Sequence, residues 1–164
     1  MDTKLLGIYL NDHLAGSIVG GELAKRAASS NEGTELGNFL ATLADEIGSE
    51  REVVKSLLDH FGVPQNRFKQ PIAWAAEKAG RLKPNGQLTG YSPLSRLVEL
   101  EGLMLGVTGK LGMWRALAST QSGLESFGIE ELIGKAETQR DGLERWRLEA
   151  AAMAFGARAP TTRV

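Results

Sequence analysis

Few residues of this chain could hold a metal ion. The sequence has no cysteine, and His13 and His60 are its only histidines. Glu50 interrupts an otherwise apolar helical stripe, and Glu101 lies beside a second one. An iron or manganese centre needs several carboxylates, and usually imidazoles, at one point. The candidate ligands are therefore Glu50, Glu101 and His13, whereas no catalytic residue is predicted.

Glu50 also has a purely structural interpretation. A carboxylate buried on an apolar stripe needs a partner or a proton. Lys110 and Arg140 are expected near the same level as Glu50, and His13 lies on a third stripe, where a hydrogen-bonded core histidine is the simplest role. The sequence thus predicts a core polar cluster of His13, Glu50, Lys110 and Arg140, in which a protein cation stands where metal charge would otherwise stand. A rotation of the helix that lets Glu50 reach solvent is the alternative.

Glycine is unusually frequent, with 20 in 164 residues, and much of it lies inside predicted helices. Gly16 and Gly20 are spaced four apart, as are Gly102 and Gly106. Each internal glycine costs about 1 kcal/mol relative to alanine. Two explanations remain open: close approach between helix backbones, or an apolar slot for a small ligand.

The composition argues against several classes of protein. The formal net charge is −1, with acids and bases interleaved, so no basic surface for nucleic acid is expected. No apolar run approaches the roughly 20 residues that cross a bilayer. The absence of cysteine, and an N-terminus that enters an amphipathic pattern without a visible signal peptide, favour a cytoplasmic protein.

These side chains are carried by an all-α chain. Apolar residues at spacings of three and four predict four long helices, over residues 3–30, 35–61, 93–121 and 129–155. Thr34 and Ser92 are expected to cap the second and third of these, and Gly62 to end the second. The long connection before Ser92 is expected to hold a short helix starting at Pro71 and to carry the chain back along the bundle. We expect one domain over residues 1–156 and a disordered tail over 157–164.

Two helical hairpins joined by a long crossover resemble the ferritin-like superfamily of four-helix bundles. The segments Trp74-Ala75-Ala76-Glu77-Lys78-Ala79-Gly80-Arg81-Leu82-Lys83 and Ser92-Pro93-Leu94-Ser95 are also similar to uncharacterised ferritin-like proteins of actinobacterial type. The resemblance implies a Glu on the first and third long helices and a Glu-x-x-His on the second and fourth, all facing the core.

The ligands that the resemblance implies are missing. The middle of the first helix has Gly16 and Ser17 in place of a glutamate, the residue three after Glu50 is Val53, and the fourth helix has no histidine. We therefore expect a non-catalytic bundle that has lost its di-metal site and works in binding or assembly.

Homodimerisation is expected through an exposed helical face, because Leu103, Leu105 and Met113 lie outside the main stripe. Two other functions stay open. The first is a metalloprotein with an atypical iron or manganese site, and the second is a carrier of a small apolar ligand in the glycine-lined interior.

Overall fold

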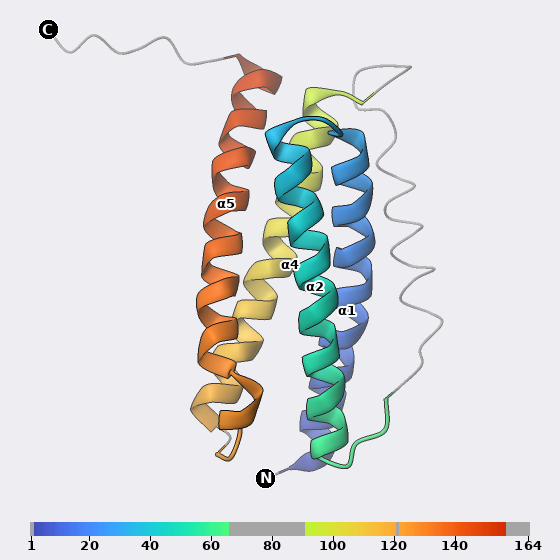
Figure 1. Cartoon of the computed structure of the whole chain (residues 1–164), viewed down its shortest axis with the longest axis vertical. Coiled ribbons are helices and arrows are strands. Elements are labelled where there is room, and N and C mark those ends of the chain that lie inside the picture. Colours follow the sequence, from blue (N-terminus) through green and yellow to red (C-terminus); the bar gives the residue numbers. More distant parts are fainter. Residues whose placement is uncertain (1, 66–90, 121, 157–164) are drawn as a thin grey trace, which may run out of the picture.

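The computed structural model describes residues 2–65, 91–120 and 122–156, and in these ranges it is all-helical (Figure 1). The long helices are α1 (Thr3–Ser30), α2 (Glu35–His60), α4 (Pro93–Thr120) and α5 (Ile129–Phe155). A single 3₁₀ turn, η1 (Glu125–Phe127), precedes α5. The all-α prediction is confirmed for the described ranges, and the helix bounds agree with the sequence pattern to within one residue.

The helix ends follow local chemistry. The Thr34 hydroxyl accepts a hydrogen bond from the backbone N–H of Gly37 at 3.0 Å, and the Ser92 hydroxyl accepts one from Ser95 at 3.0 Å. Both bonds satisfy backbone donors that lack a partner in the first helical turn. Gly62 follows α2 with a φ of 66°, a left-handed conformation that side chains disfavour. These caps are the ones that the sequence predicts.

The four long helices form two antiparallel hairpins (Figure 1). α1 packs mainly on α2, and α4 packs mainly on α5. α4 begins at the end of the bundle opposite to the one where α2 ends, so α2 and α4 run in the same direction. The expected short helix at Pro71 and the expected tail over 157–164 lie outside the described residues.

The core consists of two apolar clusters. One contains Leu10, Leu57, Leu111, Trp114 and Leu132, and the other contains Leu40, Leu43, Leu100, Val107 and Leu143. Between the two clusters lie polar side chains from all four helices: Ser17 on α1, Glu50 and Arg51 on α2, Lys110 on α4 and Gln139 on α5. We call these five residues the polar band. It crosses the bundle at the level where the sequence predicts a polar cluster.

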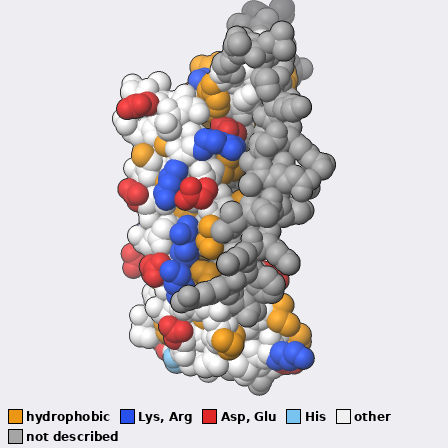
Figure 2. All heavy atoms as spheres, turned by 90° about the vertical axis from the view of Figure 1, so that its right-hand side faces the viewer, with side chains coloured by type: hydrophobic (Ala, Val, Ile, Leu, Met, Phe, Trp, Pro, Cys, Tyr) orange, Lys and Arg blue, Asp and Glu red, His pale blue; other side chains and the backbone are white. Residues whose placement is uncertain are grey.

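The outer surface is mixed in character. On the described part of the face in Figure 2, acidic and basic side chains are interspersed with hydrophobic ones. No described helix carries an apolar stretch long enough to span a bilayer. Leu103 and Met113 are buried in the core, contrary to the expectation that they extend an exposed apolar face, while Leu105 is 73% exposed.

Candidate functional site

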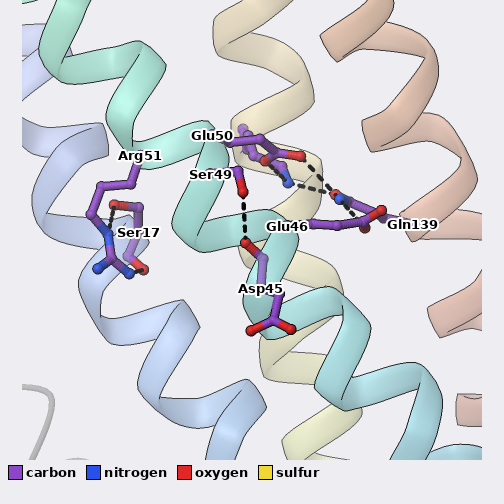
Figure 3. Close-up of polar contacts among 8 residues, drawn as sticks. Ser17, Asp45, Glu46, Ser49, Glu50, Arg51 and Gln139 are labelled. Atoms are coloured by element: carbon purple, nitrogen blue, oxygen red, sulfur yellow. Dashed lines mark hydrogen bonds and ion pairs between the residues drawn. The ribbon is translucent and has the colours of Figure 1, made fainter.

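Glu50 is the centre of a buried hydrogen-bond network (Figure 3). Its side chain is 3% exposed, and it forms an ion pair with Lys110 of α4. Gln139 of α5 accepts a hydrogen bond from Lys110 at 2.5 Å, and its amide nitrogen donates to Glu50 at 3.0 Å and to Glu46 at 2.7 Å. We call these four residues the Glu50 network. It joins α2, α4 and α5 and gives Glu50 and Lys110 each a charged partner.

The ion pair is mostly removed from solvent. The Lys110 side chain is 14% exposed, and burial lowers its pKa below the ordinary lysine value, although Glu50 and Glu46 oppose the change. An unpaired charge in this position would be strongly destabilising. The carboxylate of Glu50 and the ammonium of Lys110 therefore depend on each other.

Arg140, expected to be the second possible cation for Glu50, lies elsewhere. Its guanidinium donates to Asp141 at 2.9 Å and is 39% exposed. Successive helical residues are rotated by about 100°, and α5 directs the residue next to Arg140 to the core. That neighbour is Gln139, which is 3% exposed. The predicted cluster is thus corrected at Arg140.

The three candidate metal ligands do not converge. The Glu101 side chain is 47% exposed, 3.7 Å from Arg147 of α5. His13 is half-buried and makes an edge contact with Tyr9, their ring centroids 4.7 Å apart. Among the described residues no three acidic or histidine side chains form a group that could bind a metal. Glu50 already faces an ammonium, so this donor set does not fit a di-metal centre.

A groove of about 460 Å³ opens between α1 and α4, with α2 as its floor. Glycines line both walls: Gly16 and Gly20 on α1, and Gly102, Gly106 and Gly109 on α4. The floor is formed by Ile47, Glu50, Arg51 and Val54, and further lining comes from Tyr9, Asp12, His13, Ser17, Leu103, Leu105, Val107, Lys110, Met113 and Trp114. We call this cavity the glycine groove. Its volume falls in the range that small-molecule sites occupy.

Four of the five glycines of the groove leave space and do not mediate close packing. A Cβ atom built on Gly16, Gly20, Gly106 or Gly109 would meet no atom within 4 Å, and one on Gly102 would meet only the Leu23 side chain, at 3.3 Å. Close approach occurs at other glycines that the spacing rule misses. A Cβ on Gly142 would lie 2.6 Å from Phe39. Of the two explanations from the sequence, the open slot is the one that the geometry favours.

Arg51 crosses from α2 to α1 beside the groove (Figure 3). Its Nε donates to the Ser17 hydroxyl at 3.1 Å, and its Nη2 donates to the Ser17 carbonyl at 3.0 Å. A Cβ on Gly21 would lie 2.7 Å from the same Nη2, so the lack of a side chain at Gly21 admits the guanidinium. Arg51 is not predicted as a site residue from the sequence, because its position next to Glu50 gives no signal that its side chain turns to α1.

A second polar cluster joins α1 to the start of α4. Glu99 accepts a hydrogen bond from the Tyr91 hydroxyl at 2.9 Å and forms an ion pair with Arg26 at 3.0 Å. The Asn31 amide donates to the Tyr91 hydroxyl at 3.1 Å. Burial raises the pKa of Tyr91 to about 12. The cluster fixes the top of the bundle and shares no residue with the groove.

His13 lies on the groove wall and is half-buried. Burial lowers its pKa below the ordinary value of 6.5, and the carboxylate of Asp12 opposes this change. The groove therefore offers an apolar space, an imidazole whose charged form is disfavoured by burial, the guanidinium of Arg51 and the ion pair of Glu50 with Lys110. Comparison of the chain with protein-family models, with curated proteins and with solved structures finds no match.

Proposed function

We propose that this chain is a non-catalytic, ferritin-like helical bundle that binds a small, largely apolar molecule in the glycine groove. The single observation that carries the binding proposal is the groove itself, an apolar space of about 460 Å³ with a few polar groups at its floor. Such pockets are the usual form of small-molecule sites.

The glycines give this proposal its physical basis. Each glycine in a helix interior lowers helix stability by about 1 kcal/mol relative to alanine. No close packing offsets this loss at four of the groove glycines, because nothing lies within 4 Å of a Cβ built at Gly16, Gly20, Gly106 or Gly109. A ligand that fills the space would recover the lost contacts.

Calorimetric titration with octanol tests the proposal. Gly106→Leu should fill the groove and weaken octanol binding at least about tenfold. Gly134→Leu is the matched control, because Gly134 is an exposed helical glycine with open space around it and lies outside the groove. Absence of octanol binding to the wild type, or equal binding to the Gly106→Leu protein, would refute the proposal.

The metal-binding alternative has less support. Iron or manganese would need Glu50 as a ligand, yet Glu50 pairs with Lys110 and Gln139. Glu101 is 47% exposed and lies 3.7 Å from Arg147 of α5. We therefore place a metal-dependent function below the binding of an organic ligand.

Assembly as a homodimer is part of the proposal, and Leu105 is its principal support. The side chain of Leu105 is exposed on α4, and Leu5 and Ile8 are exposed on α1. Light scattering of the wild type and of Leu105→Glu tests it. Leu105 also lines the glycine groove, so Leu105→Glu is scored by its oligomeric state alone. A monomeric wild type would remove this element of the proposal.

A further inference from the structure

The guanidinium of Arg51 has donors to spare. Arginine carries five N–H donors, and Ser17 accepts from two nitrogens, Nε and Nη2. The two bonds to Ser17 hold the side chain against α1, so little conformational entropy remains to be lost when a further acceptor binds. Arg51 is thus a preorganised cation at the floor of the glycine groove.

The charge of Arg51 is not balanced by an acidic partner in the described ranges. The neighbouring carboxylate, Glu50, also borders the groove, but its side chain turns away from Arg51 and is satisfied by Lys110 and Gln139 (Figure 3). Asp12, also on the groove wall, is exposed to solvent. Solvent screens an exposed charge of this kind more effectively than a half-buried one.

The charged side chains that line the groove favour a ligand with one anionic group. Lys110 and Glu50 cancel each other, and Asp12 is solvated at the wall. Arg51 remains as a single positive charge beside an apolar space. A guanidinium fork matches the planar geometry of a carboxylate, and one cation balances a monoanion better than a dianion.

We infer that the ligand of the glycine groove is an amphipathic carboxylate, whose apolar body lies along the glycine walls and whose carboxylate accepts hydrogen bonds from Arg51. This inference rests on the proposed binding function and names the chemical class of its ligand. Lys110 does not bind the carboxylate of the ligand, because its ammonium group already forms an ion pair with Glu50.

The experiment compares three probes of equal chain length: octanoate, octanol and octylammonium. Each is titrated into the whole protein at neutral pH and below its micellar concentration, with calorimetric measurement of the dissociation constant. Octanoate should bind about tenfold or more tightly than octanol, because a charge-assisted hydrogen bond is added. Octylammonium should bind most weakly. Added salt should weaken octanoate binding and leave octanol binding unchanged.

Variants assign the preference to Arg51. Arg51→Met should bring octanoate to the affinity of octanol, and Arg51→Lys should retain part of the preference, because it keeps the charge but loses the fork. Arg140→Met is the matched control, since Arg140 lies outside the groove and pairs with Asp141; its preference should equal that of the wild type. Circular dichroism of each variant confirms that the helices are retained.

Two results would overturn the inference while leaving the proposed function intact. One is equal binding of octanoate and octanol to the wild type. The other is an octanoate preference that persists in the folded Arg51→Met protein. Failure of all three probes to bind would refute the proposed function itself, so the two failures are distinguishable.

Discussion

The polar band has a closed side and an open side. On the closed side, the Glu50 network joins α2, α4 and α5, and each buried polar group has a partner. On the open side, toward α1, the same level of the bundle holds the glycine groove and the guanidinium of Arg51. Two neighbouring residues of α2, Glu50 and Arg51, therefore serve opposite environments.

The two sides differ in whether a charged side chain stabilises the packing of the helices or remains available to a ligand. A buried ion pair with added hydrogen bonds satisfies its own charges and fixes the packing of the helices around it. A half-buried cation beside empty space keeps unused donors. The closed side should thus govern stability, while the open side should govern binding.

The largest effect is expected from breaking the closed side. Lys110→Met leaves Glu50 as an uncompensated buried charge, and the free energy of unfolding should fall by about 3–5 kcal/mol. Urea denaturation followed by circular dichroism measures this change. A loss below about 1 kcal/mol would mean that Glu50 finds solvent or another partner.

The control for this variant removes both charges. The Glu50→Leu/Lys110→Met double variant should recover most of the lost stability, because replacing a buried ion pair by apolar side chains is often close to neutral. A double variant as unstable as the single one would show that packing, and not charge, dominates this site.

Two glycine substitutions sharpen the contrast between filled and open space. Gly142→Leu must displace Phe39, which lies 2.6 Å from a Cβ at this position, so we expect a loss of about 1–3 kcal/mol in unfolding free energy. Gly106→Leu enters open space and should leave stability unchanged or raise it by roughly 0.5–1 kcal/mol through helix propensity. Thermal denaturation of both proteins checks the order. Equal destabilisation would argue against an open groove.

A smaller effect is expected from the pH response of His13. Because its folded pKa lies below 6.5, the folded state binds fewer protons than the unfolded state as pH falls through 6.5. The part of the unfolding free energy that depends on an uncharged His13 is therefore fully present above pH 6.5. It is lost as the pH falls below that value. His13→Gln should flatten the dependence of unfolding free energy on pH in this window. An NMR titration that gives His13 a pKa of 6.5 or higher would contradict this account.

Substitution of Glu50 is expected to have no effect on the metal content of the protein. Protein purified without chelators from cells supplied with iron and manganese should carry close to no metal, because Lys110 holds the carboxylate of Glu50. Glu50→Gln should not change the value in elemental analysis. Stoichiometric metal in the wild type that disappears in Glu50→Gln would restore the metalloprotein hypothesis.

Much of the fold, but only part of the candidate site, can be predicted from the sequence. Helix bounds follow from caps such as Thr34 and Ser92 and from apolar spacing, which are local signals. The burial of Glu50 also follows from its stripe. The choice of Lys110 over Arg140 as its partner does not, because it depends on the rotation of α5, which helix packing sets.

The open side was harder to predict from the sequence. The spacing of Gly16, Gly20, Gly102 and Gly106 signals small side chains, but it is compatible with close packing as well as with a groove. Only the separation between α1 and α4 decides between these two, and this separation is a tertiary property. The same holds for Arg51, whose direction depends on the space above Gly21.

Amide chemical-shift mapping with octanol is the decisive test of whether the glycine groove binds an apolar ligand. Octanol lacks a charge, so its position reports the apolar space alone. The account predicts that the largest shift changes fall on the backbone amides of Gly16, Gly20, Gly106 and Gly109, which line the groove. Changes concentrated instead around the exposed Met153 and Phe155 at the end of α5, or no saturable changes at all, would contradict it.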